Sequence, residues 1–164
     1  MDLILKRIQA HHRIVKPLGT LIIIALAIFV GVMVHNNAEK QGFENDGQLI
    51  IGGQELIIDI AETTNDRSVG LSRYETLESN QAMLFVFEAE GLYSFWMRDM
   101  KFPIDIIWLD SNRQIISIKE NARPEDFPES YYPDDKARYV LETVAGFSQQ
   151  YNLEIGQSVS WETR

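Results

Sequence analysis

The stretch that decides the fold is Tyr93–Asp110, YSFWMRDMKFPIDIIWLD, in which core-like residues are mixed with charged ones. Successive side chains of a β-strand point to opposite faces, so the part that follows Pro103 divides into two sets. One face carries Ile104, Ile106 and Trp108, and the other carries Asp105, Ile107 and Leu109. Both faces are largely apolar, which predicts a central strand with Asp105 inside the protein.

A buried, ionised Asp105 is costly unless it is paired or hydrogen-bonded. Arginines are the candidate partners, because a guanidinium offers a rigid fork of donors that suits a carboxylate. They are Arg98 from the same stretch and Arg67 and Arg73 from the segment RSVGLSR. We therefore expect an arginine to pair with Asp105.

The charged residues around Asp105 have two interpretations: a satisfied network that fixes strand register, or the floor of a pocket. Glu142, within YVLETV, is expected to be a second half-buried carboxylate. Trp96 is expected to be mostly buried, as strand aromatics usually are, and to roof the pocket in the second interpretation. The candidate binding pocket consists of Trp96, Arg98, Asp99, Asp105, Arg67, Arg73 and Glu142.

The distribution of charge excludes nucleic acid as a partner. The first 34 residues have a net charge of +3, whereas residues 35–164 carry 11 basic and 23 acidic residues. Binding to phosphate backbones depends on clusters of lysine and arginine, and this acidic domain offers none.

Cysteine is absent, and the three histidines, His11, His12 and His35, all lie in or beside the N-terminal segment. The downstream domain therefore cannot use Ser-His-Asp or Cys-His catalysis or a histidine-ligated metal. The acidic pairs of the chain also lack the spacing of a calcium loop, so we expect neither a metal nor a cofactor.

Residues 18–34, LGTLIIIALAIFVGVMV, form an uncharged apolar segment that is long enough to cross a bilayer as a helix. Basic residues precede it, so the positive-inside rule places residues 1–17 in the cytoplasm and the rest beyond the membrane. A cleaved signal peptide is the alternative, but the apolar run is long and no small-x-small cleavage site follows. We expect a single-pass anchor in the cell (inner) membrane, a tether over residues 35–47 and an extracytoplasmic or periplasmic domain over residues 48–164.

Within the downstream domain, short apolar runs alternate with turn signals, which is typical of a β-sandwich or barrel. The runs Gln48–Ile51 and Gln54–Ala61 flank Gly52-Gly53, a hairpin signature. Between residues 63 and 80 the pattern changes, and Thr64 is expected to cap a short helix. The predicted fold is mainly β, a small sandwich or barrel with one or two short helices, preceded by the transmembrane helix.

Five segments of this domain resemble domain-of-unknown-function family 192, a prokaryotic family. They are RSVGLSRYETL (67–77), AMLFVF (82–87), FWMRDMKFPIDIIWLD (95–110), YVLETVAG (139–146) and IGQSV (155–159). The resemblance implies an exported all-β domain with one or two small helices, and it brings no reaction. The chain departs from the family at Ala82, where glycine is usual, and at Asp99-Met100, where Asn-Thr is usual.

These observations favour a non-catalytic binding or accessory module of the envelope that recognises a small molecule, a glycan or an envelope protein. One alternative is a glycosidase-like hydrolase that uses two of the carboxylates Asp99, Asp105 and Glu142, because such a pair needs no histidine. The other alternative is a structural partner of a membrane complex.

Overall fold

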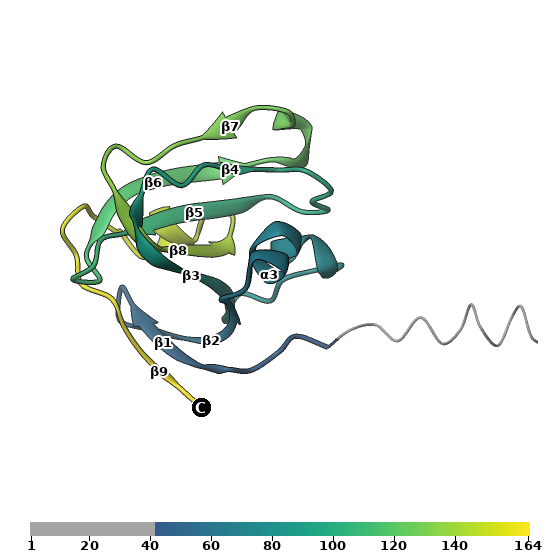
Figure 1. Ribbon diagram of the computed structural model, residues 1–164. Helices are drawn as coiled ribbons and strands as arrows, with labels where there is room; N and C mark the ends of the chain where they lie inside the picture. Colours follow the sequence, from purple (N-terminus) through teal and green to yellow (C-terminus); the bar gives the residue numbers. More distant parts are fainter. Residues whose placement is uncertain (1–41) are drawn as a thin grey trace, which may run out of the picture. The chain divides into compact units, whose positions relative to one another are not determined.

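The computed structural model describes residues 42–164, which form a seven-stranded sheet, a two-stranded ribbon and four short helical segments (Figure 1). The strand order in the large sheet is β6-β5-β8-β3-β2-β1-β9, and β4 pairs with β7 in the ribbon. The strands are β1 Gly47–Ile51, β2 Gln54–Ala61, β3 Gln81–Gly91, β4 Phe95–Trp96, β5 Ile104–Leu109, β6 Ile115–Ala122, β7 Ser130–Tyr131, β8 Ala137–Val144 and β9 Ser160–Thr163. The helical segments are α3 Thr64–Val69, η1 Gly70–Arg73, η2 Pro124–Asp126 and α4 Phe147–Gln150.

The prediction of a mainly β fold with short helices is confirmed: the strands form one large curved sheet and a two-stranded ribbon. An isolated bridge between Gln114 and Ser158 joins the segments next to β6 and β9, the two ends of this sheet. The curvature shows in the core, because Leu49 of β1 and Ile115 of β6 belong to one hydrophobic cluster although these strands stand far apart in the sheet. Among residues 42–164, no helix is long and apolar enough to cross a membrane. The predicted anchor over residues 18–34 lies outside the described residues.

The first hairpin forms as its sequence predicts. Gly52 and Gly53 have φ angles of 57° and 74°, the left-handed values that a tight turn between antiparallel strands requires. Gly52 also has the side chain of Leu153 at 2.7 Å from where a Cβ would stand. A side chain at this position would therefore be both strained and crowded.

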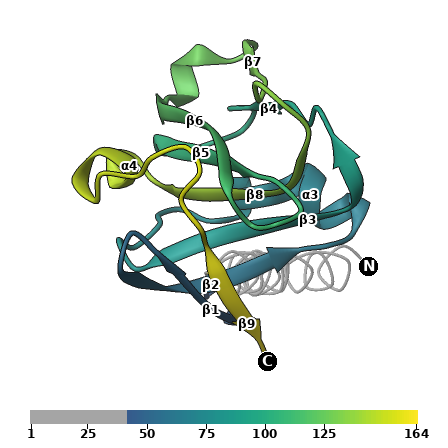
Figure 2. The same cartoon turned by 90° about the vertical axis from the view of Figure 1, so that its left-hand side faces the viewer.

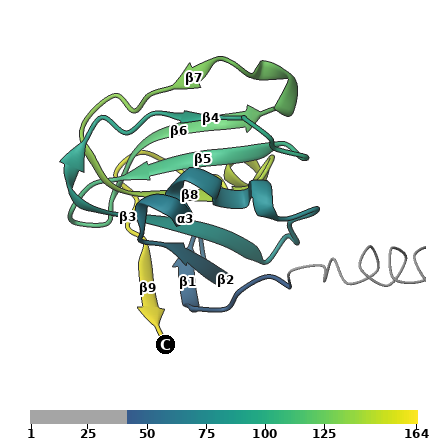
Figure 3. The same cartoon turned by 45° about the vertical axis from the view of Figure 1, so that its right-hand side comes forward.

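The pairing of β2 with β3 is parallel, unlike the other strand pairs of the described fold. Parallel neighbours need a crossover between them, and residues 62–80 supply it with α3 and η1. Thr63, rather than the expected Thr64, caps α3 by accepting a hydrogen bond from the backbone of Asp66. In Figure 3 this crossover lies in front of β3 and β8.

Both faces of the sheet are buried, which explains why β5 carries apolar side chains on both of its faces. Leu71 of η1 belongs to the core cluster of one face, together with Ile106 and Trp108, whereas Phe147 of α4 belongs to the cluster of the other face, together with Ile107. Figure 2 shows α3 and α4 on opposite sides of the sheet. The division of β5 into two faces is thus confirmed.

Asp105 is fully buried on the α4 side, and its partners differ from the arginine that its sequence context suggests. Its carboxylate accepts hydrogen bonds from the backbone N–H groups of Asn121 at 2.8 Å, Gly146 at 3.1 Å and Ser148 at 2.8 Å. The predicted pairing of Asp105 with an arginine is therefore wrong. Three backbone donors replace it because the end of β6 and the start of α4 meet at this point.

We expect Asp105→Ala to lower the free energy of unfolding by roughly 2–5 kcal/mol, because it leaves three backbone donors without their acceptor. Urea denaturation measures this loss. Asp135→Ala, at an exposed position whose carboxylate accepts a hydrogen bond from the next residue's N–H, is the matched control and should change stability little. An unchanged midpoint for Asp105→Ala would contradict the structural role.

Candidate functional site

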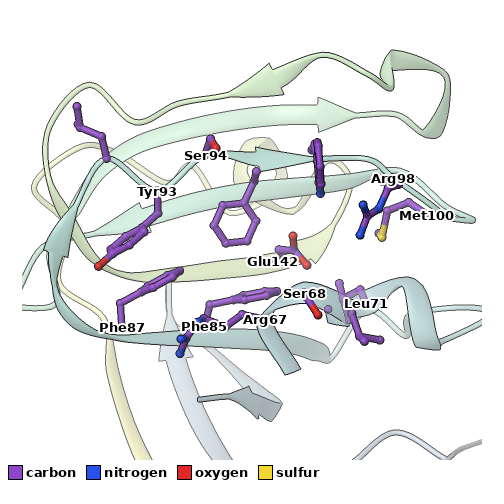
Figure 4. Close-up of a pocket in the computed structure, with 15 residues that line it drawn as sticks. Arg67, Ser68, Leu71, Phe85, Phe87, Tyr93, Ser94, Arg98, Met100 and Glu142 are labelled. Atoms are coloured by element: carbon purple, nitrogen blue, oxygen red, sulfur yellow. The ribbon is translucent and has the colours of Figure 1, made fainter. Parts of the chain in front are cut away.

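A cavity of about 410 Å³ lies between the α3–η1 crossover and the segment around β4, over the face of the sheet that β3 and β8 form (Figure 4). Aromatic and aliphatic side chains make up most of its wall, with three charged side chains among them. The lining residues are Arg67, Ser68, Val69, Gly70, Leu71, Phe85, Phe87, Leu92, Tyr93, Ser94, Phe95, Trp96, Arg98, Met100 and Glu142.

Strand alternation places Glu142 at the floor of this cavity. β8 runs between β3 and β5, and Glu142 stands opposite Met83 on one side and Ile106 on the other. Both neighbours belong to the core cluster that faces η1. The carboxyl group therefore rises from the middle of an apolar surface, and Figure 4 shows it between the crossover and the β4 segment.

The carboxyl group of Glu142 is buried, and one of its two oxygens has no hydrogen-bond partner among residues 42–164. The residue is 5% exposed, and its Oε2 atom has no hydrogen-bond partner among the described residues. Burial raises the pKa of Glu142 from 4.5 to about 8, and no charged neighbour offsets the effect. At neutral pH the group therefore holds its proton, which is unusual for a glutamate and typical of functional sites.

The two arginines of the cavity wall are held by other groups. Arg67 donates to the backbone carbonyls of Glu62 and of Val86, the latter at 3.0 Å, and its guanidinium lies 5.0 Å from the centre of the Phe87 ring. The guanidinium of Arg98 lies 4.8 Å from the centre of the Trp96 ring. Both positive charges are thus fixed against aromatic rings.

The structure brings four of the seven predicted pocket residues to the cavity: Trp96, Arg98, Arg67 and Glu142. Trp96 is 47% exposed at the rim, so the expectation that it is mostly buried is wrong. Its exposed ring adjoins Phe127, with the ring centres 6.0 Å apart.

The other three predicted residues do not line the cavity. Arg73 pairs with Asp66 at 3.7 Å and donates to the Gly70 carbonyl. Asp99 points to solvent, with 82% of its side chain exposed and a 3.8 Å contact to the neighbouring arginine. Asp105 stands on the opposite face of the sheet from Glu142.

Glu142 is the one acid among the residues that line the cavity. Glycosidases of the two-carboxylate type need both groups in one cleft, about 5–9.5 Å apart. This arrangement offers instead a single neutral carboxyl, two fixed guanidinium groups and aromatic walls. Such a site can bind an organic molecule and can exchange one proton.

Sequence reasoning missed most of the cavity wall, including Ser68, Phe85, Phe87, Tyr93 and Met100. The two phenylalanines alternate along β3, a pattern that is typical of ordinary core. Phe87 stacks on Tyr93, with ring centres 3.5 Å apart, and this contact joins β3 to the segment between β3 and β4. The sequence does contain one signal for this wall. In AMLFVF, residues 82–87, the strand period of two places the rings of Phe85 and Phe87 on the same face of the sheet.

A second group of acids lies away from the cavity. Carboxylate oxygens of Glu44, Asp46 and Asp59 stand within 4.8 Å of one another, a spacing that a metal ion can bridge. Hydrogen bonds already hold this group: Tyr74 donates to Asp59 at 2.5 Å, and the backbone of Ile60 donates to Asp46 at 3.0 Å. Burial raises the pKa of Asp59, more than the Tyr74 hydrogen bond lowers it.

Comparison with known proteins assigns the domain. The DUF192 model, described as "Uncharacterized ACR", matches residues 47–161. The chain belongs to the DUF192 family. The DUF192 domain thus covers nearly all of the described fold, including every strand that lines the cavity.

Curated relatives of the DUF192 domain are archaeal proteins, each named only as a UPF0127 protein. The one from Thermococcus sibiricus is 34% identical over 110 residues, which cover 64% of this chain and 66% of that protein. The one from Thermococcus gammatolerans is 33% identical, with the same coverage of 64% and 66%. The match therefore spans slightly less than two thirds of these relatives.

Two crystal structures share the fold. A protein of unknown function from Novosphingobium aromaticivorans gives a TM-score of 0.66 at 24% identity, covering 75% of this chain and 89% of that one. A Sinorhizobium meliloti protein, described provisionally as a transcription regulator, gives 0.65 at 24% identity, covering 73% and 98%. At this identity the likeness shows the fold alone.

The backbone conformation explains why an aspartate is tolerated at position 99. Asp99 has a φ angle of 60°, a left-handed conformation in which asparagine and aspartate are the favoured residues other than glycine. An acid at position 99 is therefore explained by the backbone and needs no ligand. Met100 lines the cavity with an apolar side chain.

We expect Glu142→Gln to change how stability depends on pH. Because the pKa of Glu142 in the folded state lies above its ordinary value, this residue favours folding below about pH 4.5, and the contribution is lost as pH rises through about 8. The wild type should lose on the order of 1 kcal/mol per pH unit in that window relative to the glutamine variant. Melting temperatures between pH 4 and pH 9 measure the difference.

Glu120→Gln is the matched control for this experiment, because Glu120 is exposed on β6. The melting temperature of Glu142→Gln should exceed that of the wild type most at high pH, and that of Glu120→Gln should follow the wild type throughout. Parallel pH profiles for the wild type and Glu142→Gln would show that Glu142 ionises as it does in water.

Proposed function

We propose that the DUF192 domain of this chain is a non-catalytic module that binds a small organic molecule in the cavity. The observation that carries the proposal is the buried carboxyl of Glu142, whose Oε2 atom has no partner. A buried polar atom without a hydrogen bond costs about 1–3 kcal/mol, and a fold tolerates this cost where a function needs the group.

The cavity around this group has the character of a ligand site. Its volume of about 410 Å³ lies within the usual range for small molecules, and its wall combines aromatic and aliphatic side chains with polar and ionisable ones. Trp96 adds an exposed aromatic surface at the rim. These features support a small molecule as the ligand over an extended polymer.

The absence of a carboxylate pair in the cavity supports binding without catalysis. Hydrolysis by acid and base needs a second group within reach of the substrate, and the lining residues include one acid and no histidine. The charged groups that remain, two guanidiniums, are suited to orienting a ligand.

The binding function is tested by a thermal-shift screen of a small-molecule library with the full chain. A ligand at 100 times its Kd should stabilise the folded state by about 2.7 kcal/mol. The shift should be reduced in Glu142→Gln and in Trp96→Ala, and retained in Tyr132→Ala, which changes an exposed aromatic residue that does not line the cavity. A screen without any cavity-dependent ligand would overturn the proposal.

The proposal also places the domain outside the cytoplasm, held to the cell membrane by residues 18–34 and the tether that follows. Three features of the sequence support this location. Residues 18–34 are apolar and uncharged, basic residues precede them, and the residues that follow are acidic in composition. An envelope location would give the cavity access to molecules that enter from outside the cell.

Membrane anchoring is tested with the full chain by alkaline extraction of membranes and protease accessibility. We expect the protein to stay with the membrane fraction and its downstream domain to be digested from the extracytoplasmic side. Leu26→Arg, in the middle of the apolar run, should weaken membrane retention, because a central arginine costs about 2.5–3.5 kcal/mol on insertion. Asn37→Arg, in the tether, is the control, and extraction of the unmodified chain would contradict the anchor.

A further inference from the structure

We infer that the cavity binds the ammonium group of a small organic amine, with the carboxylate of Glu142 as counter-ion and the aromatic wall around the apolar part of the ligand. This inference rests on the proposed binding function and adds the chemical class of the ligand. It starts from an acid that is 5% exposed, lies at the floor of a cavity and presents an oxygen without a partner.

The unpartnered oxygen of Glu142 can bind a hydrogen-bond donor of a ligand. A carboxylate accepts hydrogen bonds, and bonds from charged donors are about twice as strong as bonds from neutral ones. The uncharged polar side chains of the wall are few: Ser68, Tyr93 and Ser94 (Figure 4). A cationic N–H donor on the ligand is therefore the strongest partner that the site can accept.

The aromatic side chains of the wall also favour a cation over an anion. Five of the lining residues are aromatic, and the faces of their rings carry partial negative charge. Such rings attract organic cations and disfavour anions. The residues are Phe85, Phe87, Tyr93, Phe95 and Trp96.

The other charged or titratable groups of the cavity are Arg67 on α3, Tyr93 before β4 and Arg98 after β4. Arginines close enough to repel an ammonium group at Glu142 would also lower the pKa of its carboxyl. Burial is the one cause of the raised pKa, and no arginine offsets it. A cation at the floor is therefore compatible with both guanidiniums.

The arginines are also turned to other partners. Arg67 is held by two backbone carbonyls and faces the Phe87 ring, and Arg98 faces the Trp96 ring. The carboxyl at the floor is thus free to pair with a ligand. Binding of an ammonium group to it releases the proton that the empty site holds at neutral pH.

Three probes that share an indole ring and a two-carbon arm test the inference: tryptamine, tryptophol and indole-3-propanoate. They end in an ammonium, a hydroxyl and a carboxylate group. Calorimetry with the full chain should show that tryptamine binds more tightly than the other two at pH 8.5. Its affinity should rise about tenfold from pH 6.5 to pH 7.5 and level off above pH 8, since the carboxyl must first lose its proton.

Proton release is measured by repeating the tryptamine titration at pH 7 in buffers of different ionisation enthalpy. We expect Glu142→Gln to lower tryptamine affinity at least tenfold at pH 8.5, to abolish its dependence on pH and to leave tryptophol binding in place. Retained tryptophol binding also shows that the variant is folded. Glu120→Gln should bind all three probes as the wild type does.

Tighter binding of tryptophol or indole-3-propanoate than of tryptamine would overturn the ammonium assignment, as would a tryptamine affinity that falls between pH 6.5 and pH 8.5. Either result would leave the proposed binding function standing. Absence of binding by all three probes also overturns the assignment. The binding function itself falls only if the library screen gives no cavity-dependent ligand.

Discussion

The parallel pairing of β2 with β3 is the constraint on which the cavity depends. Two parallel neighbours cannot be joined by a tight turn, so residues 62–80 must return across a face of the sheet before β3 begins. This return forms α3 and η1, buries Leu71 against the sheet and provides one wall of the cavity. An antiparallel hairpin at this point would leave the face above Glu142 without that wall.

Much of the fold could be predicted from short-range patterns. The glycine pair between β1 and β2 specifies a hairpin, and alternation along Ile104–Leu109 correctly divides that strand between two apolar faces. The parallel pair and the curvature could not be predicted, because they depend on contacts between residues far apart in the chain. The hydrogen-bond partners of Asp105 could not be predicted for the same reason. They are backbone groups of positions 121, 146 and 148, and no side chain in the sequence identifies them.

The candidate site was predictable in part, for a related reason. Residue type and strand position identify Glu142 as an unusual acid, but they cannot show that it lacks a partner or that a cavity opens above it. The arginines were identified by type and then paired with the wrong group, because a guanidinium can bind a carbonyl or a ring as well as a carboxylate. Side-chain chemistry narrows the options, and three-dimensional proximity decides among them.

The place of β1 within the sheet has a consequence for the time course of folding. β1 pairs with its immediate successor β2 on one edge and with β9, more than a hundred positions away, on the other. Gly47 and Gln48 lie opposite Thr163 and Glu162 there, so that edge cannot close before the chain has been synthesised past residue 163. Pairings between such distant positions slow folding, and domains rich in them typically fold in milliseconds to seconds. Until then the outer edge of β1 is an open template for other strands, and a newly made chain depends on β9 to cover it.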